Sequence, residues 1–381
     1  MFPAIIVLRN EVPMTEILTK RVLIMAGGTG GHIFPGLAVA KYLKTLGASV
    51  YWLGSKTGFE VDFLKGKDIA LELIDIKGVR GKGFLQLLRA PFFIAKSIYQ
   101  ALIIIQKVKP DVVLGMGGFV SGPGAIAALL QRIPVVIHEQ NAVMGTTNRI
   151  VSTFAKKVLV GFPNTFLGAI VCGNPINKKI ASLSLETKIP QNKNNRAKLL
   201  ILGGSRGASS LNLVIPQALA MVDKNVRPEV LHQTGRDHFQ KTNDTYRSEL
   251  SVDSLQNIRL VPFIDDMSEA YQWADFVICR SGALTISELA SVGICSILIP
   301  FPYATDNHQF KNAQILVRAG SAEIVEHKNF DAQLMSERIS FYSKNRKLRQ
   351  EMSEKARLIA KSNSDERVAK ECMEVMNNGS S

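Results

Sequence analysis

Residues 21–36 of the chain, RVLIMAGGTGGHIFPG, decide the fold because they join a short apolar run to a glycine-rich turn. The run RVLIMA has the length and composition of a buried strand, and Ile33 to Gly47 have the pattern of a helix. A strand, a glycine turn and a helix in that order are typical of a doubly wound α/β sheet. Such a turn points main-chain N–H groups and the positive end of the helix at an anion, most often a phosphate.

The alternation of strand and helix continues through the first half of the chain. Further strand-like runs are SVYWLG, DVVLGMG and PVVIHE, and the segment GAIAALLQR between the last two has a helical pattern. Because these runs are apolar throughout, we expect them to be buried on both faces, as in a parallel sheet with crossover helices.

The opening motif occurs a second time at residues 198–212, where KLLILGGSRGASSLN again places a strand, a glycine turn and a helix in order. GGTGG at 27–31 and GGSRG at 203–207 therefore indicate two Rossmann-like domains. The polar, asparagine-rich segment 183–197 between them is typical of a linker. Near the end of the chain, residues 343–376 are helical and charged in pattern.

These patterns predict four parts of the chain. They are an N-terminal extension (1–20), a first domain (21–176) and a second domain (177–354). The fourth part, 355–381, is a C-terminal helix that returns to the first domain and ends in a disordered tail. The opening segment lacks the basic start and the small-residue cleavage site of a signal peptide, and Met14 offers an alternative start.

Composition narrows the class of partner. The 381 residues include 46 lysines and arginines against 32 acidic residues, so the formal net charge is +14. This charge favours acidic partners, namely phosphate ligands, nucleic acid or an anionic membrane surface. The four cysteines lack metal-ligand spacing, so reduced thiols and no metal site are predicted. No apolar run reaches the roughly 18–20 residues of a membrane-spanning helix.

Neither glycine turn fits a dinucleotide or a nucleoside-triphosphatase motif. The spacing G-x-G-x-x-G fails because Ile33 occupies the third glycine position, and no acidic residue follows the strand YWLGSK to hold a ribose. No Gly-Lys-Ser/Thr sequence follows either turn, which argues against nucleotide hydrolysis.

His32 lies where the first helix is expected to begin, with Pro35 in its first turn. The positive helix end disfavours the protonated imidazole, so His32 is expected to be neutral near pH 7 and able to act as a general base. The alternative interpretation is a histidine that caps the turn structurally.

A third turn of this kind occurs at residues 274–293, ADFVICRSGALTISELASVG, where a helix is expected to start near Ala283. Its free N–H groups suit an anion. The carboxylate of Glu288, early in this helix, suits a pair of sugar hydroxyls, because an ionised carboxylate only accepts hydrogen bonds. The alternative for Glu288 is an acid that stabilises the helix dipole.

Polar clusters follow two further strands. HEQNAVMG at 138–145 and DNHQFKNA at 306–313 lie where parallel sheets bind ligands, which places sugar-binding chemistry at the strand ends. There is no Asp-x-Asp to hold a divalent cation, and the side chains of the adjacent Asp265 and Asp266 are expected to point apart. We therefore expect helix ends and Arg206 to stabilise a diphosphate without a metal.

The stretch from residue 77 to residue 109 mixes basic and apolar residues and has no acidic one. Such a mixture suits a loop and first helical turns that contact an anionic membrane. The residues expected to do so are Arg80, Lys82, Phe84, Leu85, Leu88 and Arg89. The alternative is a helix that covers the sheet and leaves a solvated basic face, and we expect the inner residues of this stretch to be core.

Five motifs resemble, in order and spacing, those of the MurG family, the bacterial N-acetylglucosaminyltransferases that convert lipid I to lipid II in peptidoglycan synthesis. The motifs are GGTGGHIFPGLAVA, HEQNAVMG, GGSRGA, FIDDM and SGALTISELA, and the resemblance covers residues 21–365. It implies a GT-B fold, in which two Rossmann-like domains face each other across a cleft. It also implies a peripheral enzyme at the cytoplasmic face of the inner membrane, without cofactor or nucleic-acid partner, that works within cell-wall synthesis.

The resemblance implies a role for each matching position. UDP-N-acetylglucosamine (UDP-GlcNAc) would be held mainly by the second domain, with His32 and Glu139 near the acceptor, where either could be the base. The implied donor contacts are Thr29, Gly30, Gly31, Asn141, Ser205, the Ile264 main chain, the helix positions Ala283, Leu284, Thr285, Ile286 and Ser287, Glu288 at the ribose, and Gln309 at the GlcNAc hydroxyls.

Two positions depart from the family pattern. Asn177 stands where an arginine usually approaches the nucleotide, with Lys178 beside it as a substitute, and His308 replaces a glutamine. The implied reaction is an inverting transfer of GlcNAc to the 4-hydroxyl of the muramoyl sugar of lipid I. Two other functions remain open at this point: a UDP-GlcNAc 2-epimerase of the same fold, and a non-catalytic lipid- or nucleotide-binding module.

Overall fold

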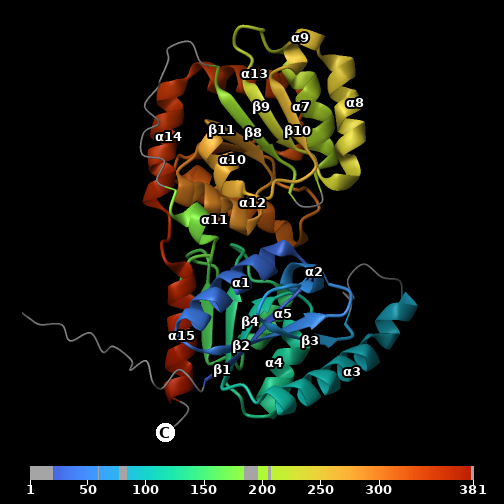
Figure 1. Ribbon diagram of the computed structural model, residues 1–381, viewed down its shortest axis with the longest axis vertical. Coiled ribbons are helices and arrows are strands. Elements are labelled where there is room, and N and C mark those ends of the chain that lie inside the picture. Colours follow the sequence, from blue (N-terminus) through green and yellow to red (C-terminus); the bar gives the residue numbers. More distant parts are fainter. Residues whose placement is uncertain (1–19, 59, 77–83, 184–195, 205–206, 379–381) are drawn as a thin grey trace, which may run out of the picture. The chain divides into compact units, whose positions relative to one another are not determined.

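The computed structural model describes residues 20–58, 60–76, 84–183, 196–204 and 207–378, and for residues 84–90 it describes the backbone alone (Figure 1). Contacts divide the chain into two units. The first comprises Met1–His138, Thr146–Val158 and Asp365–Ser381, and the second comprises Glu139–Gly145 and Leu159–Ser364.

The first unit is built on a sheet with the strand order β3-β2-β1-β4-β5-β6-β7. Its strands are β1 (Arg21–Ala26), β2 (Ser49–Ser55), β3 (Ala70–Ile74), β4 (Val112–Gly117), β5 (Val135–Glu139), β6 (Lys157–Val160) and β7 (Ile170–Val171). The helices are α1 (Gly30–Thr45), α2 (Glu60–Leu64), α3 (Phe84–Val108), α4 (Ser121–Leu130), α5 (Thr146–Val151) and α15 (Ser364–Asn378). Residues from Leu159 onward in β6, and β7, are grouped with the second unit.

The second unit contains a sheet with the order β10-β9-β8-β11-β12-β13. Its strands are β8 (Lys198–Leu202), β9 (Glu229–Gln233), β10 (Ile258–Val261), β11 (Phe276–Cys279), β12 (Ser296–Leu298) and β13 (Ala322–Ile324). The α-helices are α6 (Lys178–Ala181), α7 (Ser209–Met221), α8 (Phe239–Glu249), α9 (Val252–Leu255), α10 (Met267–Trp273), α11 (Ala283–Val292), α12 (His308–Arg318), α13 (Ala332–Lys344) and α14 (Arg346–Leu358). Short 3₁₀ helices are η2 (Arg236–His238), η3 (Thr305–Asn307) and η4 (His327–Asn329).

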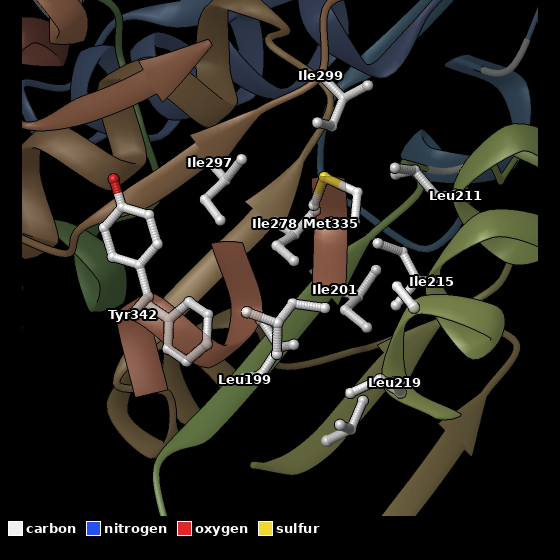
Figure 2. Packing of buried hydrophobic residues seen from close by; sticks show 14 of the residues in the cluster. Leu199, Ile201, Leu211, Ile215, Leu219, Ile278, Ile297, Ile299, Met335 and Tyr342 are labelled. Atoms are coloured by element: carbon white, nitrogen blue, oxygen red, sulfur yellow. The ribbon is translucent and has the colours of Figure 1, made fainter. Parts of the chain in front are cut away.

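The central strands β8, β11 and β12 of the second sheet are buried on both faces, as expected of continuous apolar runs in a parallel sheet. Leu199 and Ile201 of β8 belong to one core cluster, whereas Leu200 and Leu202 belong to another. Figure 2 shows the first cluster, in which side chains of β8 and β11 meet those of α7 and α13. Each leucine or isoleucine buried in this way contributes roughly 1.5–3 kcal/mol.

The predicted fold class, two Rossmann-like doubly wound units, is confirmed by these two sheets. The helical C-terminal stretch differs from the pattern in one respect, because it is divided into the end of α13, α14 and α15, with Asn363 at a φ of 53° before α15. Residues 139–145 are grouped with the second unit by their contacts. The segment that returns to the first unit begins at Asp365, whereas the predicted segment begins at residue 355.

Helix α15 is attached to the first unit by apolar and ionic contacts. Val368 and Cys372 are fully buried, and Lys157 at the start of β6 lies 2.5 Å from carboxylate oxygens of both Glu371 and Glu374. Helix α15 is therefore part of the same packed unit as β1.

Candidate functional site

Each sheet has one point at which the strand order reverses, and the glycine turns lie there. In the first sheet this point is between β1 and β4, where Ala26 is in register with Gly117. In the second it is between β8 and β11, where Leu202 is in register with Cys279. The turns after these strand pairs therefore leave the sheet next to each other. Open α/β sheets bind ligands at such switch points, beyond the carboxyl ends of the strands.

The turn after β1 presents His32 at the first turn of a helix. Helix α1 begins at Gly30, and His32 is its third residue, partly exposed, with its main-chain N–H donated to the Thr29 carbonyl at 3.1 Å. Because the helix starts three residues earlier than the predicted segment at Ile33, Pro35 lies beyond the first turn, which corrects its predicted position. Thr29, Gly30 and Gly31 form the N-terminal end of α1, where main-chain N–H groups precede the first helical hydrogen bonds.

A second glycine turn, between β4 and α4, contacts the first one. Gly117 and Gly118 have φ values of 99° and 83°, which favour glycine, and a Cβ on Gly118 would collide with the Gly27 carbonyl oxygen. A Cβ on Gly117 would lie 2.7 Å from Nδ1 of His32, so the imidazole packs directly on this glycine. This turn was not among the predicted ones, although GMGGFVSG repeats the signal of a strand, two glycines and a helix.

In the second unit, α11 directs free N–H groups at the switch point. The first helical hydrogen bond runs from the Ile286 N–H to the Gly282 carbonyl at 3.0 Å, so the N–H groups of Ala283, Leu284 and Thr285 precede it. Ile286 is an exception to the predicted donor contacts. Its N–H is used in the helix and its side chain is fully buried in the core, so neither group is available to a ligand.

Glu288 lies in the second turn of α11, beyond the first turn in which a helix dipole acts most strongly on an acid. Its carboxylate accepts a hydrogen bond from the Tyr271 hydroxyl at 2.9 Å. Desolvation raises the pKa of the Glu288 carboxyl to about 7, and the Tyr271 hydrogen bond partly offsets this rise. An acid held at this pKa next to a helix N-terminus is typical of a functional site.

The loop after β5 is fixed by two side chains. The Glu139 carboxylate, 3% exposed, accepts hydrogen bonds from the main-chain N–H and side-chain amide of Asn141 and from the Gly145 N–H, all at 3.0–3.1 Å. The buried Asn312 of α12 accepts from the Ala142 N–H at 2.8 Å and donates to Asn141 Oδ1 and to the Ser281 carbonyl, both at 3.2 Å. These contacts tie the loop to the turn that precedes α11.

Arg280 is a cation at the second switch point and was not among the predicted site residues. Its guanidinium donates to the carbonyls of Ile299 and Pro300 and, at 2.8 Å, to the hydroxyl of Ser210 in the first turn of α7. It also lies 5.5 Å from the centre of the Phe301 ring, and the main-chain N–H of Phe301 donates to Gln309 Oε1. A positive charge beside the N-terminal turns of two helices suits a diphosphate.

The chain matches known domains along most of its length. Residues 22–160 match the Glycosyltransferase family 28 N-terminal domain, and residues 198–372 match the Glycosyltransferase family 28 C-terminal domain. The crystal structure of Acinetobacter baumannii MurG is similar with a TM-score of 0.79 and 39% identity, over 93% of this chain and 99% of that one. The chain belongs to the MurG family of glycosyltransferases.

Curated relatives agree with this assignment to the MurG family. A protein of Shewanella piezotolerans is 46% identical over 362 residues, 94% of this chain and 98% of its own length. A protein of Saccharophagus degradans is 44% identical over 365 residues, 94% of this chain and 92% of its own length. Both are named UDP-N-acetylglucosamine–N-acetylmuramyl-(pentapeptide) pyrophosphoryl-undecaprenol N-acetylglucosamine transferase.

The two departures from the MurG family pattern have local structural roles. Asn177 is the N-cap of α6, where its side chain accepts from the Lys179 N–H, and Lys179 in turn lies 3.2 Å from Asp266. His308 begins α12 and its Nδ1 is 2.7 Å from the Thr305 carbonyl. Lys178 is the first residue of α6.

Other residues that the MurG resemblance selects are placed as follows. Asn141 is held by Glu139 and Asn312, and the Ser287 hydroxyl accepts from the Asn174 amide at 2.9 Å. Ile264 lies in the loop between β10 and α10, packed against the core. Ser205, Arg206, Arg80 and Lys82 lie outside the described residues, and for Phe84, Leu85, Leu88 and Arg89 only the helical backbone is described.

Helix α3 lies on the outside of the first unit (Figure 1). Several of its apolar side chains are exposed. Phe92, Phe93 and Tyr99 are 73%, 52% and 64% exposed, while Ala101 and Ile105 are buried in the core. Within the described ranges, no helix has both the length and the apolar character that crossing a membrane requires. Nor do the side chains described there include a group of three or more His, Cys, Asp or Glu residues that could hold a metal ion.

Proposed function

We propose that the protein transfers GlcNAc from UDP-GlcNAc to undecaprenyl-pyrophosphoryl-MurNAc-pentapeptide, lipid I, and so produces lipid II. The substrates are those in the names of relatives that are 44–46% identical over 94% of the chain. The structural observation that carries the proposal is the N-terminus of α11 with Glu288 in its second turn, because free N–H groups and a carboxylate acceptor suit a nucleoside diphosphate sugar.

The donor binds to the second unit in this proposal. The N–H groups of Ala283, Leu284 and Thr285 receive the diphosphate, Glu288 accepts the ribose hydroxyls, and Arg280 neutralises charge that develops on the leaving UDP. Asn141 and Gln309 contact the GlcNAc, and the Ile264 main chain contacts the uracil. Preorganised main-chain donors of this kind need no divalent cation, so the transfer is proposed to be metal-independent.

His32 is the proposed base that takes the proton from the 4-hydroxyl of the muramoyl sugar. Its imidazole is partly exposed at the helix N-terminus, whereas the Glu139 oxygens already accept three N–H groups in a site that is 3% exposed. The deprotonated hydroxyl attacks the anomeric carbon as the bond to UDP breaks, which inverts the configuration at that carbon. The role proposed for Glu139 is to hold the loop that carries Asn141.

The first unit is the proposed membrane side. Lipid I presents its sugar at the membrane surface, and the exposed Phe92, Phe93 and Tyr99 of α3 suit an interface with lipid. The net charge of +14 favours anionic headgroups. We therefore propose a peripheral enzyme at the cytoplasmic face of the inner membrane, working in peptidoglycan synthesis and thereby in cell shape and division.

The test is UDP release from UDP-GlcNAc in the presence of a lipid I analogue, with and without EDTA. We expect release that requires the acceptor and does not change with EDTA. His32→Ala should lower turnover by about 10²–10⁴-fold, while His327→Ala, at an exposed histidine of η4, serves as the matched control. Release of UDP without acceptor, together with a sugar epimerised at C2, would instead indicate an epimerase. An unchanged turnover rate in His32→Ala would exclude His32 as the base.

A further inference from the structure

A buried carboxylate lies beneath the glycine turn that carries His32. Glu60, the first residue of α2, is 0% exposed. Its Oε1 accepts from the Ser55 N–H at 2.5 Å, and its Oε2 accepts from the Gly28 N–H at 3.3 Å. Both carboxylate oxygens are thus used to hold main chain, one in the turn after β1 and one at the end of β2.

Three glycines leave the space that this carboxylate fills. A Cβ on Gly27 would lie 2.7 Å from Glu60 Oε1, and a Cβ on Gly54 would lie 2.7 Å from its Cγ. A Cβ on Gly58 would collide with both carboxylate oxygens. Side chains are therefore absent on three sides of one buried acid, as expected where a backbone must approach a fixed group closely.

The contact with Gly28 affects the position of His32 through a short length of chain. Gly28 has a φ of 91°, Thr29 is the N-cap of α1, and the His32 and Ile33 N–H groups both donate to the Thr29 carbonyl. On its other side the imidazole rests on Gly117. The carboxylate also takes up the Gly28 N–H, which is then withdrawn from any phosphate that approaches the turn.

We propose that Glu60 is a positioning residue for the acceptor end of the reaction, holding the first glycine turn in the conformation that presents His32. The inference rests on the proposed function, in which His32 is the base and the donor binds to the second unit. A residue that only stabilised the fold would affect all steps alike. A residue that positions His32 affects turnover and leaves donor binding unchanged.

Glu60→Gln is the first test, because glutamine has the same shape but only one accepting oxygen for two N–H donors. We expect kcat to fall about 10²-fold, the effect of misplacing a reacting group by about 1 Å, while the Kd for UDP-GlcNAc stays within about twofold of the wild-type value. Asp62→Asn, an exposed acid of the same helix α2 with the same change of charge, is the matched control and should turn over normally.

A second variant keeps the test valid should Glu60→Gln fold poorly. Gly27→Ala leaves the acid in place but pushes a methyl group against Glu60 Oε1 and Val120, and the φ of Gly27 is not in the left-handed region. Gly27→Ala should lower kcat as Glu60→Gln does, and its affinity for UDP-GlcNAc should be unchanged. Wild-type turnover in both variants, or a parallel loss of kcat and donor affinity, would overturn the proposal.

A double variant tests whether Glu60 acts through His32. Glu60→Gln combined with His32→Ala should be no slower than His32→Ala alone, within about twofold, whereas independent effects would multiply. Amide hydrogen exchange at Gly28 to His32 gives a readout that needs no activity, and it should become faster in Glu60→Gln. If the wild-type protein releases no UDP, the proposed function is wrong. If amide exchange at Gly28 to His32 is unchanged in Glu60→Gln, the proposed role of Glu60 is wrong, whatever the function.

Discussion

At the scale of a single residue, the proposed contact of Glu288 with the donor predicts that donor binding depends on pH. Its pKa is raised to about 7 by desolvation, and only the ionised form accepts two sugar hydroxyls. Below pH 7 the carboxyl must therefore lose a proton when UDP-GlcNAc binds, so we expect affinity to rise with pH from about 6 to about 8, by at most about tenfold per unit. Calorimetry in two buffers of different ionisation enthalpy would count the released proton.

The variant Glu288→Gln provides the control, since an amide does not ionise in this range. It should bind UDP-GlcNAc more weakly and with no pH dependence between 6 and 8. Binding of wild-type protein without proton release at pH 6.5 would contradict the assignment of Glu288 to the ribose.

The positions of some proposed site residues were predictable from the sequence and those of others were not, for a physical reason. His32, Glu288 and the start of α11 were predictable because each lies within one strand–turn–helix segment, where spacing determines geometry. Two contacts were not predictable, because each joins segments far apart in the chain. They are the contact of Gly117 with His32 and that of Glu60 with Gly28. Local spacing does not encode such contacts.

Helix α3 is the element for which the structure supports a membrane experiment. Phe92 and Phe93 are 73% and 52% exposed, and removing one such ring from water contributes roughly 1.5–3 kcal/mol. We expect Phe92→Ser with Phe93→Ser to weaken binding to vesicles that contain anionic lipid at least about tenfold. UDP release from a water-soluble acceptor analogue should not change.

Phe341→Ser, at a 43% exposed phenylalanine of α13 in the second unit, is the matched control for vesicle sedimentation. Equal vesicle binding by all three proteins would exclude this part of α3 from the membrane contact. Higher salt should weaken the binding of the wild-type protein, because cations that meet anionic headgroups are screened.

Element types were more predictable than element ends. The apolar runs became strands and the segment from residue 343 to residue 376 became helical, as expected. Its interruptions, at Asn345 and between Leu358 and Ser364, were not predicted, because neither contains a proline or glycine that would end a helix. Packing sets the second interruption: Arg357 contacts Gly293 in the second unit, whereas Val368 is buried in the first.

At the scale of the whole molecule, His232 predicts that the free energy of unfolding decreases in acid. This buried histidine of β9 lies 3.0 Å from the Tyr246 hydroxyl, and desolvation lowers its pKa to about 3, below the usual value near 6.5. The unfolded chain therefore binds a proton that the folded chain excludes. Stability is complete above about pH 6.5 and falls as the pH drops toward 3, by at most ~1.4 kcal/mol per unit from this group.

Chemical denaturation of the wild type and His232→Gln at several pH values would measure this effect. The difference in unfolding free energy between the two proteins should shrink steadily as the pH falls from 6.5 to 4. A difference that is independent of pH would show that His232 is not the responsible group. Carboxylates elsewhere titrate in both proteins and cancel in the comparison.

The repeated glycine turn made the two-unit architecture predictable, but the sequence did not indicate how the chain is shared between the units. Residues 139–145 contact the second unit because Glu139 and Asn312 hold that loop, and the register of such contacts is set only in three dimensions. Likewise, Lys157 and its partners on α15 are separated by most of the second unit in sequence.

The attachment of α15 has a consequence for the order of events on the ribosome. The unit that starts at β1 lacks its last helix until every residue of the other unit has been translated, so the portion made first is the one finished last. Meanwhile the surface that later covers Val368, Cys372 and Met376 faces water. A nascent or prematurely terminated chain would expose this apolar surface to chaperones and proteases, whereas the second sheet, β8 to β13, has all its strands once residue 324 has been translated.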